Sequence, residues 1–235
     1  MTTILAIDTA SDACSVALYR EGMYEQRYAV APRQHSQIIF SMFGELLPDG
    51  RLRQQGIEAI AYGCGPGSFT GLRIAASAVQ GLAFANDLPA IPVSTLACQA
   101  AGAVRLGLID ESTPILSVLD ARINEIYAAV YTISNGVPRL HHGPVVCAPE
   151  DLNIAGENAL QAVGNGCAFV DKFPAALRHR LSTVVPEALP QAMDLVPTAL
   201  DRLAAGDVQS AAQVQPVYVR DEISWKKISE QGKRP

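Results

Sequence analysis

The segment GPGSFTGLR at positions 65–73 has the residue types that could hold a phosphate. Its glycines let a ligand approach the backbone, and it leads from an expected strand into an expected helix, whose N-terminus favours an anion. Ser68 and Thr70 are therefore candidate phosphate contacts. A Walker A loop is excluded because no lysine follows Gly71, and a hydrolase nucleophile elbow is excluded because Pro66 stands two residues before the serine. A tight turn that lets strand and helix pack together is the favoured explanation.

Composition limits the classes of protein to which these residues can belong. The 235 residues are 49% hydrophobic and only 17% charged, which allows one large domain or two small ones with a sizeable core. The net charge of −5 lacks the basic excess of a protein that grips RNA alone. Five cysteines without CxxC spacing argue against a disulfide framework or a zinc site. With no signal peptide and no apolar stretch of membrane-spanning length, we expect a cytoplasmic protein without membrane contact.

The elements that must position the glycine-rich turn recur in the second half of the chain. Strands are expected at 3–8, 14–19, 23–30, 57–63 and 90–93, with helices at 35–47, 68–84 and 95–106. Near Pro114 the layout restarts, with strands at 115–119 and 125–133 and a hairpin turn at 134–136. We interpret this as two copies of one unit of three strands and a helix. The predicted organisation is an N-terminal domain at 1–106, a C-terminal domain at 107–220 and a polar, basic tail at 221–235.

The helices expected at 35–47 and 68–84 carry more apolar surface than a helix on one sheet needs. Burial within their own domain and formation of a subunit interface, with two helices from each chain, are about equally favoured. The interface hypothesis predicts nine contact residues: Ile38, Ile39, Met42, Phe43, Leu46, Leu72, Ala75, Val79 and Leu82. It also predicts that acidic substitution of Phe43, Leu46 or Val79 breaks association and leaves a folded monomer.

The chain resembles the TsaB family along its whole length. The segment at 65–73 is similar to that family's signature. Further matches occur in order along the chain: IDT at 7–9, HS at 35–36, STL at 94–96, PVYVR at 216–220 and WKK at 225–227. The WKK sequence resembles the gammaproteobacterial members most closely.

This resemblance implies an α/β fold of the actin-like ATPase (ASKHA) type, with two ribonuclease-H-like domains whose mixed sheets are flanked by helices. It implies a heterodimer with the catalytic paralogue TsaD and an association with the small ATPase TsaE. Together these proteins transfer a threonylcarbamoyl group to the adenosine next to the tRNA anticodon. The chain would be a non-catalytic scaffold that binds and activates TsaD, contacts tRNA only indirectly and forms a homodimer when alone. The two N-domain helices would form the dimer surface, which favours the interface hypothesis.

The resemblance also directs attention to the histidines. TsaD carries an HxxxH metal-binding pair on its equivalent first helix, where two histidines four residues apart can reach one ion. Here Ile39 stands four residues after His35, while His141 and His142 are adjacent and would point to opposite faces of a strand. We predict no metal site and no catalytic residues, and we expect His35 to contact backbone or solvent.

A nucleotide site is the remaining implication. Actin-like folds hold phosphates with the first hairpin and with a glycine-rich loop that opens the second domain. Asp8 and Thr9 remain in the first hairpin as candidate contacts, but the turn at 120–124 has no glycine. We therefore expect no cofactor of the chain's own, with ATP or ADP bound only within the complex with TsaD and TsaE. A simpler role for Asp8 is a hydrogen bond to its own turn.

Two other classes of function stay open. One is an actin-like-fold enzyme with its own active site, either a peptidase or a small-molecule kinase, although no convergent nucleophile, base or second phosphate clamp is visible. The other is direct RNA binding, which only the short basic tail favours. The candidate tail contacts, with the protein complex or with tRNA, are Arg220, Trp225, Lys226 and Lys227.

Overall fold

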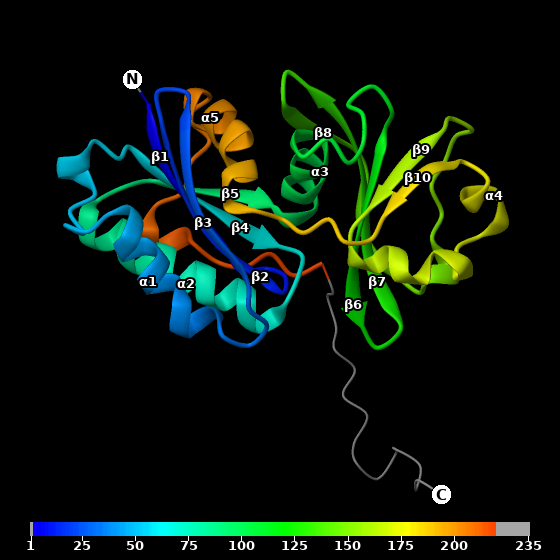
Figure 1. Cartoon of the computed structure of the whole chain (residues 1–235), viewed down its shortest axis with the longest axis horizontal. Helices are drawn as coiled ribbons and strands as arrows, with labels where there is room; N and C mark the ends of the chain where they lie inside the picture. The colour runs from blue at the N-terminus through cyan, green and yellow to red at the C-terminus, as the bar shows by residue number, and fades with distance from the viewer. Residues whose placement is uncertain (1, 220–235) are drawn as a thin grey trace, which may run out of the picture.

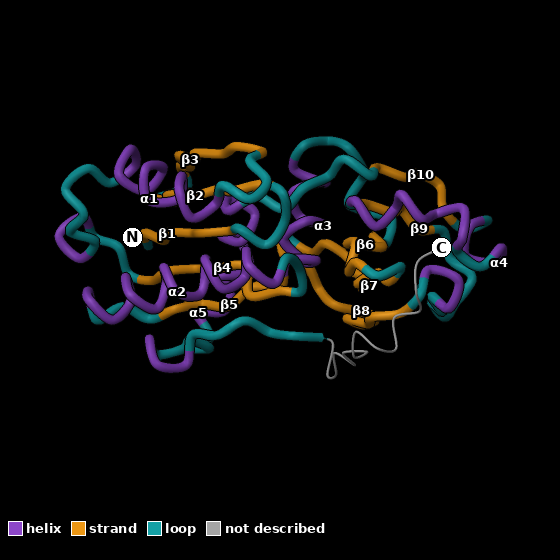
Figure 2. Tube along the Cα trace, turned by 90° about the horizontal axis from the view of Figure 1, so that it is seen from below, coloured by secondary structure: helices purple, strands orange, loops and turns teal. Residues whose placement is uncertain are grey.

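The structure is a computed structural model that describes residues 2–219, and it contains two sheets side by side (Figure 1). The first sheet has the order β3-β2-β1-β4-β5, with β1 (Thr3–Asp8), β2 (Ala13–Arg20), β3 (Met23–Val30), β4 (Ala59–Gly65) and β5 (Ala90–Ser94). The second has the order β10-β9-β6-β7-β8, with β6 (Ile115–Arg122), β7 (Glu125–Ser134), β8 (Val137–Cys147), β9 (Leu160–Val163) and β10 (Leu181–Val185). The α-helices are α1 (His35–Leu46), α2 (Phe69–Asn86), α3 (Thr95–Arg105), α4 (Ala175–Arg178) and α5 (Val196–Ala204). Figure 2 shows the two sheets along the length of an elongated molecule.

The strands follow from apolar runs that are separated by turn residues. All six residues of β1 are buried, as is typical of a central strand covered on both faces. The β2–β3 turn places Glu21 and Gly22 at positive φ, and the β7–β8 turn does the same with Asn135 and Gly136. Such turns match the right-handed twist of a hairpin. The hairpin predicted at 134–136 is thereby confirmed.

The second sheet repeats the topology of the first. In each, three consecutive strands form an antiparallel meander, and a fourth strand pairs in parallel with the first strand of that meander. A fifth strand then pairs in parallel with the fourth. The predicted duplication is confirmed for the strands but is wrong for the helix. Whereas α1 follows β3, the corresponding connection between β8 and β9 contains a short 3-10 turn, Pro149–Asp151.

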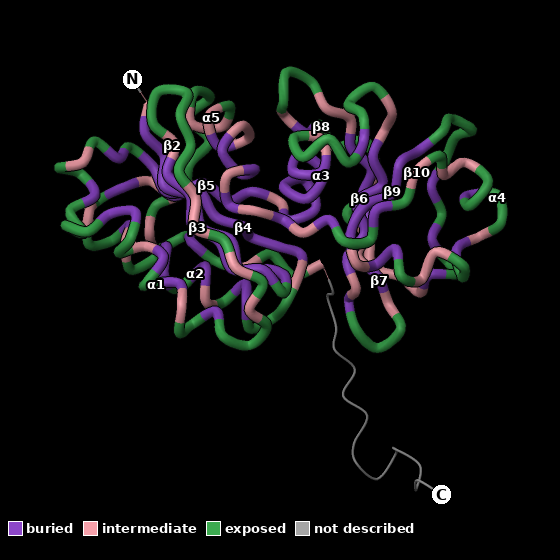
Figure 3. The backbone as a smooth tube through the Cα atoms, viewed as in Figure 1, coloured by how far each residue is buried: buried purple, intermediate pink, exposed green. Residues whose placement is uncertain are grey.

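Helices cover both faces of the first sheet. One face packs against α1 and α2 through a core that includes Leu5, Ile39 and Val79. The other face packs against α5 and the preceding 3-10 turn, Ala192–Leu195. In Figure 3 the central strands are buried, whereas buried and exposed residues alternate along α1 and α2.

The packing crosses the domain boundary that we predicted between residues 106 and 107. Helix α3 lies between the two sheets and packs Leu96 and Ala100 into the core of the second sheet. Five of its eleven residues are alanine or glycine, and these small side chains let it fit between two layers. Helix α5, from the second half of the chain, covers the first sheet. A boundary at residue 106 therefore separates the two sheets. It does not separate their cores, because each core contains residues from both sides of the boundary.

Within residues 2–219, no helix is both long enough and apolar enough to cross a membrane.

Candidate functional site

The glycine-rich turn connects β4 to α2 and packs against the β1–β2 turn. Ser68 is the N-cap of α2, where its hydroxyl accepts a hydrogen bond from the Gly71 amide at 3.3 Å. The Ser68 amide donates to the Ala10 carbonyl at 2.7 Å, and the Thr9 hydroxyl donates to the Gly71 carbonyl at 2.7 Å. The two turns that were candidates for holding a phosphate are therefore bonded to each other.

The glycines of this turn make room for the chain's own backbone. A Cβ at Gly71 would overlap the Thr9 carbonyl oxygen, and a Cβ at Gly67 would overlap the Ala10 carbonyl oxygen. The side of the loop that glycines open is filled by residues 9–10. The explanation of a tight turn that allows close packing is thus confirmed.

Asp8 ends β1 in a fully buried position. Its Oδ1 accepts a hydrogen bond from the Ala10 amide at 3.1 Å, which confirms the expected bond to its own turn. Its Oδ2 has no hydrogen-bond partner among the described residues and occupies the space that a Cβ at Gly63 would need. Burial raises the pKa of Asp8 to about 7, the Ala10 bond opposes that shift, and the nearby Asp194 adds to it.

The four predicted phosphate contacts do not form one site. Asp8 and Thr9 are fully buried, and Ser68 is used as a helix cap. Thr70 is exposed and lies on a different surface, between α1 and α2. The β6–β7 turn also closes on itself, since Asp120 accepts from the Arg122 amide at 2.8 Å and pairs with its guanidinium at 3.1 Å. This arrangement does not support the predicted phosphate contacts.

Two of the histidines form hydrogen bonds within the chain. His35 is buried, and its Nε2 lies 3.2 Å from the Ala13 carbonyl oxygen, which confirms the expected backbone contact. His141 Nε2 lies 2.9 Å from the Thr132 hydroxyl. In the part of the chain that the structure describes, no three His, Cys, Asp or Glu side chains come close enough to hold a metal ion.

Most of the predicted interface residues lie inside the domain. Ile39, Met42, Leu46, Leu72, Ala75 and Val79 are buried in the core under α1 and α2, and Ile38, Phe43 and Leu82 are half-buried against that core. The apolar arcs are wide because the helices are covered from more than one side. Residues 211–214, far along the sequence, pack onto α2 through Ala211 and Val214. The predicted acidic substitutions of Leu46 and Val79 would therefore place a carboxylate in the core.

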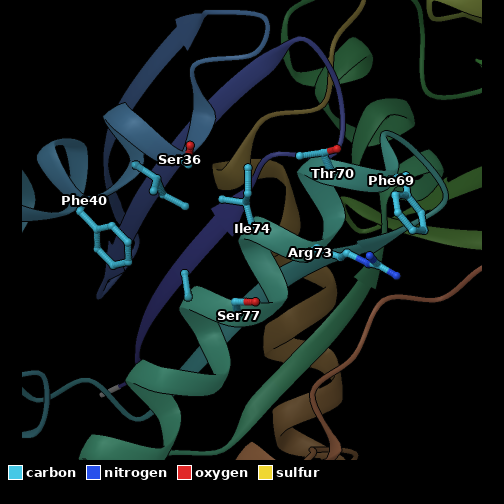
Figure 4. Close-up of a pocket in the computed structure, with 9 residues that line it drawn as sticks. Ser36, Phe40, Phe69, Thr70, Arg73, Ile74 and Ser77 are labelled. Carbon is cyan, nitrogen blue, oxygen red and sulfur yellow. The ribbon is translucent and has the colours of Figure 1, made fainter.

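The exposed apolar surface of these helices comes from other residues. Phe40 is 59% exposed and Phe69 is 50% exposed. They border an open groove of about 460 Å³ between α1 and α2 (Figure 4). The groove is lined by Ser36, Ile39, Phe40, Phe69, Thr70, Arg73, Ile74, Ser77 and Ala78. The sequence signal for Phe40 is its position four residues from both Ser36 and Gly44, which places it on the solvent face.

The C-terminal segment packs beside two of the residues that line this groove, Phe69 and Arg73. The Val217 amide donates to the Cys64 carbonyl at 2.8 Å, and the Tyr62 hydroxyl donates to the Gln215 carbonyl at 3.2 Å. Beyond these anchors, Tyr218 packs beside Phe69 with ring centroids 5.7 Å apart. The predicted tail contacts, Arg220, Trp225, Lys226 and Lys227, lie outside the described residues.

Known proteins match this chain over nearly its whole length. A family model described as "TsaD: tRNA N6-adenosine threonylcarbamoyltransferase" matches residues 27–223. Proteins named tRNA threonylcarbamoyladenosine biosynthesis protein TsaB are 37% identical in Escherichia coli and 34% identical in Haemophilus influenzae, each over 96% of this chain and 97% of the relative. The solved structure of YeaZ from Pseudomonas aeruginosa is 37% identical, with a TM-score of 0.83 over 93% of this chain and 100% of that chain.

Proposed function

The chain belongs to the TsaB family, and from that membership we propose that its part in tRNA threonylcarbamoyladenosine biosynthesis is to bind a TsaD-type protein through the groove between α1 and α2. In this proposal it carries out no chemistry and acts as a dimerisation subunit that holds its catalytic partner in the active conformation. The predicted fold class, α/β and actin-like with two mixed sheets flanked by helices, is confirmed by the family match and the YeaZ structure.

The observation that carries the proposal is the exposed apolar surface of the groove. Phe40 projects from α1, Ile74 lies on the side of α2 toward α1, and Phe69 lies at the start of α2 beside Arg73 (Figure 4). Single exposed apolar residues are ordinary, but two half-exposed aromatic rings around one groove are typical of a docking site. Small polar residues, Ser36 and Ser77, lie at its border and leave room for a partner helix.

The family match supports a partner of the same fold. The TsaD model matches residues 27–223, a range that includes both α1 and α2. A TsaD-type protein is therefore expected to carry an equivalent pair of helices. Two such pairs can pack around a pseudo-two-fold axis as a four-helix arrangement, in which each groove receives a helix of the other chain.

The geometry of the glycine-rich turn supports the proposal that this chain catalyses no reaction. The backbone of residues 9–10 fills the space that its glycines create, and Ser68 is engaged as a cap. A nucleotide phosphate at this loop would have to displace two hydrogen bonds within the chain. We propose that any ATP or ADP, and the ATPase TsaE, bind to the assembled pair, that tRNA contact is indirect, and that the same groove pairs two copies when the partner is missing.

The test is threonylcarbamoyl transfer to tRNA with purified TsaD-type protein and TsaE, with and without this chain. We expect no turnover by the chain alone and a requirement for it in the mixture. Phe40→Asp is expected to abolish co-elution with the TsaD-type protein and the activity that depends on it, because a carboxylate would be desolvated in the groove.

Leu140→Asp is the matched control, since Leu140 is 52% exposed on β8, in the other sheet. It should leave association and activity unchanged. Turnover by the chain alone would contradict the non-catalytic role, and normal association of folded Phe40→Asp would contradict the groove as the docking site.

A further inference from the structure

The helices that form the groove carry very few charged residues. Over the lengths of α1 and α2 these are His35, Glu45 and Arg73. His35 is buried against the Ala13 carbonyl. The Glu45 carboxylate is paired with Arg27 at 2.8 Å. Arg73 is thus the charged group of these two helices that is exposed at the groove and has no opposite charge beside it among the described residues.

Arg73 is held in one orientation by neighbours on two segments. Its guanidinium carbon lies 3.8 Å from the centroid of the Phe69 ring, and its Nε donates to the Tyr218 hydroxyl at 3.1 Å. No described residue accepts a hydrogen bond from its two terminal nitrogens. A guanidinium that is fixed by a stacked ring and a hydroxyl acceptor loses little entropy when those nitrogens meet a carboxylate in a two-bond geometry.

We propose that Arg73 is the residue that selects the occupant of the groove, by requiring a TsaD-type partner that places a carboxylate against its guanidinium. This inference rests on the proposed function and adds a specificity-determining residue to it. Tyr218 is the positioning residue, since its hydroxyl accepts from Nε and leaves the two terminal nitrogens without an acceptor among the described residues.

The same geometry disfavours pairing of two copies of this chain. In a two-fold pair, identical surfaces meet, so each copy contributes an Arg73 and no free carboxylate from its two helices. Glu45 could serve only by giving up Arg27. An interfacial charge without a partner costs free energy on desolvation, so self-pairing is weaker than pairing with a protein that supplies the carboxylate.

The experiment measures two affinities for the full-length chain, one for itself by sedimentation velocity and one for the TsaD-type protein by titration calorimetry at low and high salt. Arg73→Met keeps the length of the side chain and removes its charge. We expect it to weaken binding to the TsaD-type protein by about 10- to 100-fold and to flatten the salt dependence, as loss of a charged hydrogen bond predicts. Self-association should become several-fold stronger.

Tyr218→Phe keeps the ring beside Phe69 and removes the acceptor. It should weaken binding to the TsaD-type protein less than Arg73→Met does, with an unchanged melting temperature. The double variant should be no weaker than Arg73→Met alone, because Tyr218 acts only through Arg73.

The outcomes distinguish failure of this inference from failure of the proposed function. A wild-type chain that does not bind the TsaD-type protein overturns the proposed function. Normal binding that Arg73→Met leaves unchanged, or an equal loss of both affinities, overturns this inference alone. Asp221→Asn with Glu222→Gln tests whether the carboxylate comes from this chain's own C-terminal residues. If that variant reproduces the effects of Arg73→Met, the inference is overturned, and unchanged affinities support it.

Discussion

Asp8 is a carboxyl group at the end of β1 that the fold removes from solvent. Only one of its oxygens has a hydrogen-bond partner among the described residues, and burial raises its pKa from 3.8 to about 7. The folded state therefore binds the Asp8 proton more tightly than the unfolded chain does. From this one side chain, stability should be highest below pH 4 and should fall as the pH rises toward 7.

The prediction is that Asp8→Asn removes this pH dependence. As the pH rises from 5 to 8, the free energy of unfolding of the variant should increase relative to that of the wild type by about 2–4 kcal/mol, since each unit of pKa shift corresponds to about 1.4 kcal/mol. Urea unfolding at both pH values measures this gain. Asp12→Asn, at an exposed position in the same turn, is the control for simple loss of a charge. If the free energy of unfolding of Asp8→Asn changes with pH in parallel with that of the wild type, ionisation of Asp8 costs the folded state no free energy, and the prediction is wrong.

The glycines of α2 allow a matched comparison at the same scale. A Cβ at Gly71 would overlap the Thr9 carbonyl oxygen, whereas a Cβ at Gly81 meets open space. Gly71→Ala should cost about 1–3 kcal/mol by forcing the two turns apart, and Gly81→Ala should stabilise by about 0.5–1 kcal/mol through helix propensity. Thermal unfolding compares them, and equal effects of the two substitutions would refute the packing role of Gly71.

At the scale of elements, α1 shows how one helix divides its apolar residues between the core and the surface. Leu46 and Met42 face the sheet, and Phe40 faces the groove. In the sequence the residues of both faces belong to one wide apolar arc, so hydrophobic periodicity does not distinguish them. The structure separates them, because β2 and β3 bury one side and leave the other beside α2.

Acidic substitutions on the two faces of α1 should therefore have different effects. Leu46→Asp should destabilise the isolated chain by about 3 kcal/mol or more, since it buries a carboxylate in the core. Phe40→Asp should change stability by no more than about 1 kcal/mol, because its ring is 59% exposed. Chemical unfolding of the isolated variants tests the assignment of faces, and a severely destabilised Phe40→Asp would contradict it.

At the scale of the whole molecule, an ion pair connects α3 with the turn before α5. Asp194 is almost completely buried, and its Oδ1 lies 2.6 Å from Arg105 Nε. Gly102 leaves the space for this carboxylate, because a Cβ there would lie 2.6 Å from Asp194 Oδ2. The pair connects the helix between the sheets to the segment that covers the first sheet.

Arg105→Ala should destabilise the chain by about 2–4 kcal/mol, since it leaves a buried carboxylate unpaired. Burial raises the pKa of Asp194, while Arg105 lowers it. Without Arg105 the carboxyl can escape the cost by protonation, so the loss should be smaller at pH 5 than at pH 8. Calorimetric unfolding at both pH values measures it. Arg139→Ala, which breaks the exposed pair with Asp201, is the control and should cost no more than about 1 kcal/mol.

The sequence predicted the family, the strands and helices of the first sheet, and the first hairpin of the second sheet. Apolar runs, Glu21-Gly22 and Asn135-Gly136 specify strands and hairpins through local chemistry, and the meander with its repeat follows from their order. The role of Asp8 was also predicted, because it bonds to backbone two residues along in its own turn. For His35 a contact with backbone or solvent was expected, and its backbone partner, Ala13, lies 22 residues earlier in the chain.

Which apolar residues are buried and which are exposed depends on packing between segments that are far apart in the sequence. Hydrophobic periodicity reports how wide an apolar arc is, but it does not report what covers it. Helix α2 is covered by residues 211–214, and α3 is enclosed by both sheets. Long-range packing thus buries six of the nine predicted interface residues and leaves Phe40, Phe69 and Arg73 exposed at the groove. For the same reason the glycine-rich turn holds the chain's own backbone, because no local pattern encodes the approach of a turn almost sixty residues earlier.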